Sequence, residues 1–372
     1  MDISKLLLDA RNHNLYIRKE SEANFESLAK QNLGDFLCLL SEELSNEDKI
    51  KENRQLAASI IKNLIVIHEG MQKEWLQMDE SKRNQIKLYI LSTLASSHRE
   101  VRRAVSSTIA GICKVELPLG KWGEIISTLS QNAFNENMNF RLASLETLGY
   151  ICEELSNKSI NQNDVELIIS ALLKNLQNES CDSQIAIICL TALLHSVSLA
   201  EKNFKTPEHS VVILETVFKL CKTFVNDEKA STIFSLIIQF FIDLSQKYYQ
   251  FIDPYIQRIS ELTIFIVNFY FKQISQGNDE KLSILAFEFW CTLGDKEVSL
   301  IKSEHYKGYL EKFTNPLVEL ILANIKKFST SRDDDEINDW NLSKSSAYLL
   351  SLIVQFSKQE LIDNLIGYVT SN

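Results

Sequence analysis

Glycine and proline are scarce in this sequence. Only 10 Gly and 4 Pro occur among 372 residues, although the turns of β-sheets and irregular loops depend on these two residue types. The scarcity favours an all-helical protein. No segment rich in Gly, Pro or Ser divides the chain, so we expect one continuous array over residues 1–372 rather than two or three globular domains.

Long hydrophobic runs and a secretion signal are also missing. The longest apolar stretches, such as Leu262 to Phe271, fall short of the roughly 20 residues that span a bilayer, so no membrane insertion is expected. The amino terminus lacks the basic segment and the cleavage site of a secretion signal. Seven scattered cysteines are typical of core residues in a reducing compartment. We therefore expect the protein in the cytoplasm or the nucleus.

No motif for catalysis or metal binding occurs in the sequence. It has no Gly-rich phosphate loop, no HExxH, no CxxC and no GxSxG. The six histidines are far apart, and none has Cys or Asp at metal-ligand spacing. We predict that the protein is not an enzyme and carries no cofactor or metal. The formal charge of −10 disfavours direct binding to nucleic acid and favours basic protein partners.

Two thirteen-residue segments repeat the same pattern. They are VRRAVSSTIAGIC, from Val101 to Cys113, and FRLASLETLGYIC, from Phe140 to Cys152, which begin 39 residues apart. In the first copy an apolar stripe follows helical spacing, and it consists of Val101, Ala104, Val105, Thr108, Ile109 and Ile112. A period of this size is typical of stacked antiparallel helix pairs, since one pair cannot bury its own apolar face. The sequence therefore predicts an α-solenoid with extended surfaces for other proteins.

Periodicity and start signals divide the chain into about eight helix pairs. Two prolines, Pro118 and Pro207, are expected in the first turn of a helix, where proline costs no hydrogen bond. The pairs are Ile3–Lys30; Asn32–Leu40 with Asp48–His68; Ser81–Ser96 with Glu100–Val115; a helix from Pro118 with the Phe140 copy; Asp164–Leu176 with Ser183–Leu199; Pro207–Phe224 with Ala230–Tyr249; Pro254–Gln276 with Glu280–Leu300; and His305–Phe328 with Leu342–Ser357.

A lone helix is expected at the end of the chain, from Gln359 to Thr370. It lacks a partner, and the chain stops without the polar outer face that a terminal repeat needs. We therefore expect a fragment of a longer protein. The alternative is that this helix docks its apolar residues, Ile362, Leu365, Ile366 and Val369, on the eighth pair as a cap. The pattern also leaves open whether Pro316 kinks or divides the first helix of that pair.

Several separated blocks of the sequence resemble one family. In chain order they are IKNL (Ile61–Leu64), GMQKEWLQMDESKRNQIKLYILSTL (Gly70–Leu94), LETLGYICEEL (Leu145–Leu155), KYYQFIDPY (Lys247–Tyr255), EFW (Glu288–Trp290) and DDDEINDWN (Asp333–Asn341). This pattern resembles the amino-terminal portion of the importin-beta family of nuclear import receptors. The resemblance implies a right-handed superhelix of HEAT repeats and a full chain that is much longer than 372 residues.

The resemblance implies partners as well. Importin-beta family members bind a Ran-type GTPase in its GTP state and phenylalanine-glycine nucleoporins, and they carry cargo through an importin-alpha-type adaptor or bind basic cargo directly. Much of the adaptor site lies beyond residue 372 in the family. The GTPase contacts second helices of the first pairs and the acidic loop of the eighth pair. The matching residues here are Lys62 and the carboxylates Asp333, Asp334, Asp335 and Asp339.

The same residues also have ordinary structural explanations that involve no partner. An exposed lysine such as Lys62 is usually only solubilising, and an isolated acidic run such as Asp333–Asp335 is commonly a solvated loop. Trp340 would then anchor that loop to the eighth pair rather than contact a partner.

The family's nucleoporin site lies on the outer surface, between the first helices of the fifth and sixth pairs. The aligned residues are Ile169, Ser170 and Leu173 on one helix and His209, Val212 and Ile213 on the next. The sequence departs from the family pattern at two of them. Val212 stands where an aromatic residue is expected, and His209 where an acidic one is. Either this groove is shallower or another groove dominates, and the aliphatic residues can equally be ordinary core between repeats.

A nuclear transport receptor is thus the first interpretation. The alternative is a generic HEAT-repeat scaffold for a multi-subunit complex, such as a phosphatase, which would bind the GTP and GDP states of a GTPase equally.

Overall fold

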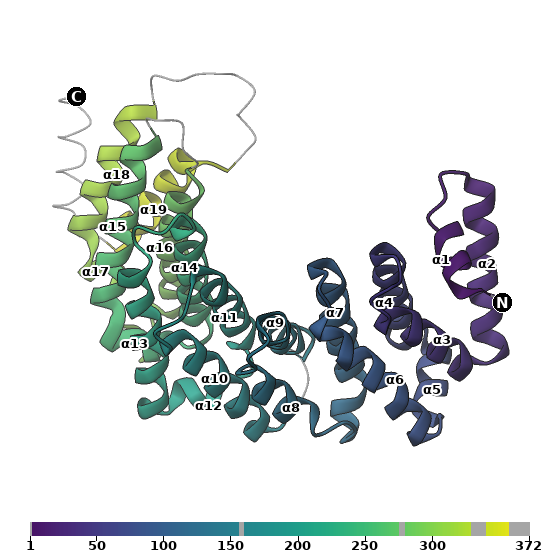
Figure 1. The fold of residues 1–372 in the computed structure, drawn as a ribbon. Helices are drawn as coiled ribbons and strands as arrows, with labels where there is room; N and C mark the ends of the chain where they lie inside the picture. The colour runs from purple at the N-terminus through teal and green to yellow at the C-terminus, as the bar shows by residue number, and fades with distance from the viewer. Residues whose placement is uncertain (1, 156–159, 275–279, 329–339, 357–372) are drawn as a thin grey trace. The chain divides into compact units, whose positions relative to one another are not determined.

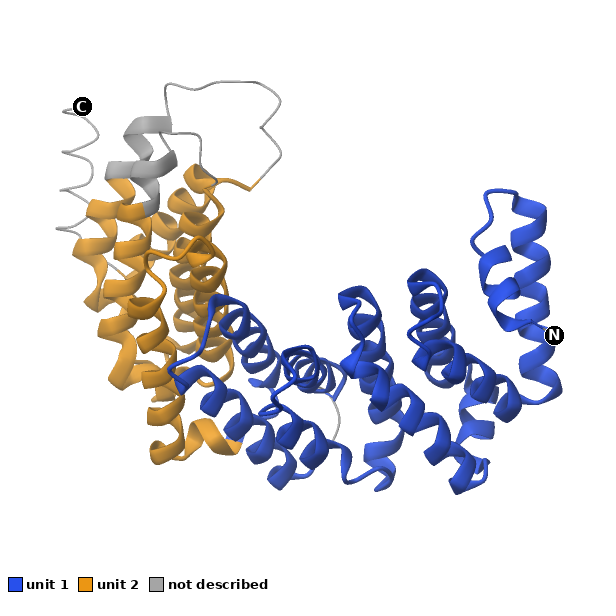
Figure 2. Ribbon diagram, in the orientation of Figure 1, with its two compact units in different colours: residues 1–201 blue, residues 202–372 orange. Residues whose placement is uncertain are grey.

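The computed structural model describes residues 2–155, 160–274, 280–328 and 340–356 (Figure 1). Every regular element in these ranges is a helix, which confirms the all-α prediction. None of the described helices is long and apolar enough to span a membrane. The chain forms two compact units, residues 1–201 and 202–372 (Figure 2). The single continuous array over residues 1–372 remains a prediction.

The first unit contains helices α1 to α11 and two 3₁₀ helices. In chain order they are α1 (Ile3–Asp9), α2 (Leu15–Gln31), α3 (Leu33–Ser45), α4 (Lys51–Val66), α5 (Glu69–Gln77), α6 (Glu80–Ser92), the 3₁₀ helix η1 (Thr93–Ala95), α7 (Arg99–Glu116), the 3₁₀ helix η2 (Leu117–Leu119), α8 (Ile125–Asn132), α9 (Met138–Leu155), α10 (Gln162–Gln177) and α11 (Ser183–Ser196).

The second unit begins within a short helix, α12 (Glu201–Lys205). The helices that follow are α13 (Pro207–Thr223), α14 (Ala230–Lys247), the 3₁₀ helix η3 (Tyr249–Tyr255), α15 (Ile256–Ile274), α16 (Lys281–Leu300), α17 (Tyr309–Lys312), α18 (Thr314–Phe328) and α19 (Leu342–Phe356). The expected terminal helix, Gln359–Thr370, lies outside the described residues.

In each unit, corresponding helices of successive pairs pack against one another. In the first unit the second helices α4, α7, α9 and α11 pack side by side in one row, while the first helices α3 and α6, and α8 and α10, pack in another (Figure 1). In the second unit α14, α16 and α19 form the corresponding row. This arrangement confirms the predicted fold of stacked helix pairs.

The two repeated segments lie on adjacent members of this row, α7 and α9. In each copy the same threonine bonds to the preceding second helix. Thr108 donates to the carbonyl oxygen of Ala58 in α4, at 2.9 Å, and its equivalent Thr147 donates to the hydroxyl of Ser106 in α7, also at 2.9 Å. The apolar stripe predicted on α7 is buried except for half-buried Ala104.

Glycine sets how closely two of these helices approach. A Cβ atom on Gly149 of α9 would lie 3.0 Å from Cβ and 3.1 Å from Cα of Ala192 in α11. Such distances are shorter than ordinary van der Waals contact. The backbone of α11 therefore packs directly on α9 at this point, and any side chain at position 149 would push the two helices apart.

The predicted helix start at Pro118 is wrong, whereas the start at Pro207 is confirmed. Pro118 lies in η2, and α8 begins only at Ile125. Between them Gly120 and Trp122 adopt left-handed backbone conformations, with φ of 68° and 56°, which no helix can continue through. The buried Trp122 ring lies 4.7 Å from the ammonium of Lys87, a cation–π contact that holds this turn.

Two further differences concern the helix boundaries. The sequence pattern missed α5, whose Trp75 is fully buried and donates to the buried carboxylate of Glu116 at 2.9 Å. The first helix of the eighth pair is divided into two helices, α17 and α18. The division lies at Phe313 and not at Pro316. Pro316 occupies the first turn of α18, where its missing N–H costs no hydrogen bond.

Candidate protein-binding site

The exposed side of the second helices in the first unit forms a polar surface, which we call the second-helix face. One hollow in it, the α4–α7 groove, has a volume of ≈ 580 Å³. Residues of α4, α7 and α9, together with Ile67 at the end of α4, line it: Gln55, Ser59, Lys62, Asn63, Ile67, Glu100, Arg103, Ala104, Ser107, Thr108 and Tyr150.

Helical spacing explains why these residues share one face. Gln55, Ser59 and Lys62 recur every three or four positions along α4 and so point to one side. The opposite side of α4 carries Ala57 and Ile61, which are fully buried. Burial of the apolar stripe therefore turns the polar stripe outward, and the same amphipathic logic places Arg103 and Ser107 on the exposed side of α7.

Lys62 is held in an ion-pair cluster that joins three second helices. Its ammonium lies 3.2 Å from a carboxylate oxygen of Glu154 in α9 and 2.9 Å from the hydroxyl of Ser107 in α7. Lys114 of α7 contacts the other oxygen of Glu154 at 2.6 Å. Partial burial alone would raise the pKa of Glu154, but the hydrogen bonds from Lys114 and Lys62 lower it. We call Lys62, Lys114 and Glu154 the Glu154 clasp.

A second hollow adjoins the groove, and we call it the α7–α11 cavity. Its volume is ≈ 260 Å³, and α7, α9 and α11 line it. Arg103 lies on its rim, where Nε is 3.2 Å from a carboxylate oxygen of Glu146 and Nη2 donates to the hydroxyl of Tyr150 at 3.4 Å. Arg103 and Tyr150 line both hollows, so the two are parts of one surface.

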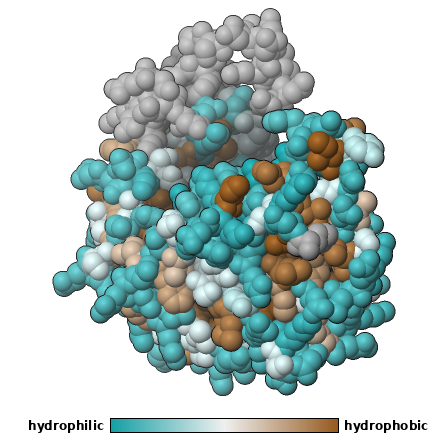
Figure 3. Space-filling model, turned by 45° about the vertical axis from the view of Figure 1, so that its right-hand side comes forward, coloured by the Kyte–Doolittle hydropathy of each residue, from teal (hydrophilic) through white to brown (hydrophobic). Residues whose placement is uncertain are grey.

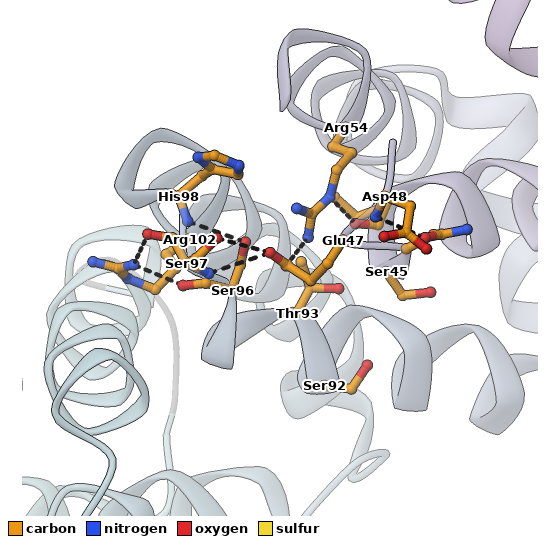
Figure 4. Close-up of polar contacts among 12 residues, drawn as sticks. Ser45, Glu47, Asp48, Arg54, Ser92, Thr93, Ser96, Ser97, His98 and Arg102 are labelled. Carbon is orange, nitrogen blue, oxygen red and sulfur yellow. Dashed lines mark hydrogen bonds and ion pairs between the residues drawn. The ribbon is translucent and has the colours of Figure 1, made fainter. Parts of the chain in front are cut away.

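Consecutive turns of the first unit are joined by Glu47 (Figure 4). Its carboxylate accepts from fully buried Arg54 at 2.5 Å and from the hydroxyl of Ser97 at 2.9 Å. Partial burial would raise the pKa of Glu47, but hydrogen bonds from Arg54, Ser96 and Ser97 lower it to about 2. Glu47 thus ties the turn before α4 to the turn before α7 and supports the edge of the second-helix face.

The structure describes only part of the predicted GTPase site. Lys62 lies on the second-helix face, half-buried in the Glu154 clasp. The four acidic residues, Asp333, Asp334, Asp335 and Asp339, lie outside the described residues. Trp340 is 50% exposed, and its ring makes an edge contact with Tyr348 of α19, with centroids 6.4 Å apart.

The six residues of the predicted nucleoporin groove fall on two helices of different units. On α10, Ile169 and Leu173 are buried and Ser170 is half-buried. On α13, Ile213 is buried, whereas His209 and Val212 are exposed. Each unit is described by itself, so the groove between these helices remains a prediction.

Sequence reasoning missed most of the second-helix face. It did not single out Lys114, Glu154, Arg103, Glu146 or Tyr150. A signal was present, since Glu146, Tyr150 and Glu154 of α9 recur every four residues, opposite the buried stripe of the repeated segment. Such a stripe indicates the exposed side of a helix, but only the packing of α9 on α7 shows which cations face it.

Apolar residues on the surface are scattered. In the space-filling view of Figure 3 most visible side chains are hydrophilic, and hydrophobic ones gather in separate small groups. The most exposed large apolar side chains in the described ranges include Tyr16, Ile67 and Leu88. Exposed apolar side chains of this kind are ordinary on protein surfaces.

Stacked helix pairs with a polar, hollowed face define the class of this protein as a helical-repeat protein. Residues 22–96 match the family model "Importin-beta N-terminal domain", and residues 97–262 match "IPO5-like, TPR repeats". Importin subunit beta-1 of Arabidopsis thaliana is 27% identical and covers 99% of this chain. The chain thus carries an importin-beta N-terminal domain and is similar to importin subunit beta-1 along nearly its whole length.

Other relatives and solved structures agree with this assignment. Importin subunit beta-1 of Saccharomyces cerevisiae is 25% identical over 96% of the chain, and the chain spans 42% of the length of each of these two relatives. A crystal structure of importin beta superposes with a TM-score of 0.81 at 25% identity, covering 100% of this chain and 43% of that one.

Two similar structures are complexes of the yeast protein. One describes how Kap95p binding induces the switch loops of RanGDP to adopt the GTP-bound conformation, with a TM-score of 0.81 at 24% identity. The other is a Kap95:Nup1 complex, with a TM-score of 0.79 at 23% identity. This chain is covered completely in both, and it covers 42% and 43% of those chains.

Proposed function

We propose that this chain is part of a nuclear transport receptor that binds a Ran-type GTPase in its GTP state on the second-helix face. The observation that carries the proposal is the α4–α7 groove, in which Lys62 and Arg103 lie beside exposed Glu100. The likeness to a Kap95p structure determined with RanGDP supports the same partner class.

The shape and chemistry of the groove suit a protein surface. A protein partner can use charges of both signs spread over several helices, because electrostatic complementarity fixes its orientation and speeds its association. The Glu154 clasp supports this use, since it holds the ammonium of Lys62 at a fixed position across α4, α7 and α9. The carboxylates Asp333, Asp334, Asp335 and Asp339 would add a second contact for basic residues of the GTPase.

Further partners follow from the family and from charge. Phenylalanine-glycine nucleoporins would bind the helices that carry Ile169 and Val212, and the likeness to a Kap95:Nup1 complex supports this partner class. An importin-alpha-type adaptor or basic cargo suits a chain with a formal charge of −10. These partners would place the protein in the cytoplasm, the nucleus and the nuclear pore. We ascribe no catalysis to it.

The test compares two nucleotide states of one GTPase. Ran loaded with a non-hydrolysable GTP analogue or with GDP is passed over the immobilised chain, and both dissociation constants are measured. We expect clear preference for the GTP-like state and a weaker complex for Lys62→Met, which keeps the alkyl stem and removes the ammonium. The matched control is Lys174→Met, because Lys174 is an exposed residue of α10, outside the second-helix face. Equal or absent binding in both states would contradict the proposal and favour a generic repeat scaffold.

A further inference from the structure

The α7–α11 cavity has the size of a side-chain pocket. Its volume of ≈ 260 Å³ lies below the roughly 300–1,000 Å³ of sites that enclose a small molecule. The lining combines two classes of residue. The apolar floor comes from α9 and α11 and consists of Gly149, Ile187, Ile188 and Ala192. The polar rim comes from α7, α9 and α11 and consists of Arg99, Arg103, Glu146, Tyr150, Thr191 and His195.

Close helix packing forms the floor. Because Gly149 has no side chain, α11 approaches α9 closely at Ala192. Ile187 and Ile188 of α11 remain half-buried beside this contact, so part of their apolar surface faces the cavity without a protein partner covering it. An apolar side chain that entered here would remove this surface from water, which is the main favourable contribution to such binding.

The rim of the cavity carries a positive charge that no described residue neutralises through an ion pair. Arg99 is exposed and makes no hydrogen bond or ion pair with any described residue. The one carboxylate that lines the cavity, Glu146, already accepts from Arg103 and from Tyr150. Glu153, just outside the lining, lies 3.8 Å from Nδ1 of His195, which also lies 3.3 Å from the carbonyl oxygen of Gly149. A carboxylate arriving at Arg99 therefore meets a free guanidinium, whereas an arriving cation meets two arginines.

We infer that the α7–α11 cavity binds a short acidic–apolar segment of a partner protein, with an apolar side chain on the floor of Ile187, Ile188 and Ala192 and an adjacent carboxylate against Arg99 and Arg103. An aromatic residue fits the apolar position best, because the arginine guanidiniums can also lie over its ring. Guanidinium groups bind carboxylates with two parallel hydrogen bonds, which fixes the direction of the segment. The inference does not depend on GTPase binding.

The experiment uses the 372-residue chain and a fluorescein-labelled peptide, Gly-Ser-Gly-Asp-Phe-Asp-Gly-Ser-Gly, followed by fluorescence anisotropy without GTPase. Two comparison peptides replace both Asp by Lys, or Phe by Ala. We expect the parent peptide to bind about tenfold more tightly than either comparison peptide, because each lacks one of the two contacts.

Two variants of the chain assign the binding to this cavity. Thr191→Phe fills the cavity from α11, and Arg99→Glu reverses the free charge on its rim. Each should weaken binding of the parent peptide about tenfold. Lys174→Glu makes the same charge change on α10 and should leave binding unchanged. Circular dichroism checks helicity, and Arg99→Glu alone decides the outcome if Thr191→Phe does not fold.

Three results would overturn the inference: equal affinity for the Asp and Lys peptides, no measurable binding of the parent peptide, or equal loss in Lys174→Glu and Arg99→Glu. Failure here is distinguishable from failure of the proposed function. Thr191 and Arg99 line the α7–α11 cavity and not the α4–α7 groove, whereas Lys62 lines only the groove.

Discussion

Lys62 of α4 and Glu154 of α9 form an ion pair of 3.2 Å, although 92 residues separate them in the chain. The pair reaches across α7, whose Lys114 shares the same carboxylate. A residue that the family resemblance assigns to a partner is therefore also part of the protein's own structure. Its effect on binding and its effect on folding must be measured separately.

Replacing Glu154 by Gln should lower the free energy of unfolding by about 1 kcal/mol or less, because both lysines of the clasp are partly exposed. Urea unfolding at low and high salt measures this. Salt should reduce the difference between wild type and variant, since partly exposed charges are screened. A loss above roughly 3 kcal/mol, unchanged by salt, would instead indicate a fully desolvated pair.

Replacing Gly149 by Ala should destabilise the first unit by about 1–3 kcal/mol, because the new methyl group would lie against the backbone of Ala192. Gly70 is the matched control, since a Cβ there meets no atom within 4 Å. Gly70→Ala should change stability by less than about 1 kcal/mol. Thermal unfolding compares the two variants, and equal midpoints would show that α9 and α11 separate at little cost.

The low pKa of Glu47 should make stability depend on pH in the acid range. Its folded-state pKa of about 2 lies below the ordinary value of 4.5. The contribution is therefore complete above about pH 4.5 and is lost as the pH falls from there towards 2. Glu47→Gln removes the titrating group, so its stability should fall less steeply in this window. Chemical unfolding at intervals between pH 5 and 3 tests this, and parallel curves for the two proteins would refute it.

Replacing Asp333, Asp334 and Asp335 by Asn should slow association with the GTPase several-fold and flatten its salt dependence. The reason is long-range attraction between an acidic run and basic groups, which acts mainly on the association rate. Stopped-flow fluorescence at two ionic strengths measures both quantities. Helicity by circular dichroism should stay unchanged, and an association rate equal to that of the wild type would count against a role for this run.

The repeated segments explain why much of the fold could be predicted. Val101–Cys113 and Phe140–Cys152 carry the same apolar stripe, and burial of that stripe requires neighbouring copies, so stacked helix pairs follow from periodicity alone. The helix start at Pro118 was predicted wrongly, because periodicity does not show where a helix begins. A proline suits the first turn of a helix, but the left-handed Gly120 and Trp122 keep α8 from starting before Ile125.

The candidate site was less accessible to sequence reasoning. Lys62 was found because IKNL resembles a family motif, whereas Glu154 has no local signal that connects it with Lys62 or Lys114. Their contact depends on how α4, α7 and α9 stack, and this stacking is set by the packing of buried side chains along the whole row. The charges that meet on such a surface are a property of the packed helices rather than of any one segment.

The central claim, that the second-helix face binds the GTPase, is tested most directly by hydrogen–deuterium exchange with mass spectrometry. Deuterium uptake of the chain is compared with and without Ran carrying a non-hydrolysable GTP analogue. The account predicts slower uptake in peptides of α4 and α7, with α8 and α10 unchanged. Slower uptake confined to α8 and α10, with α4 and α7 unaffected, would contradict it.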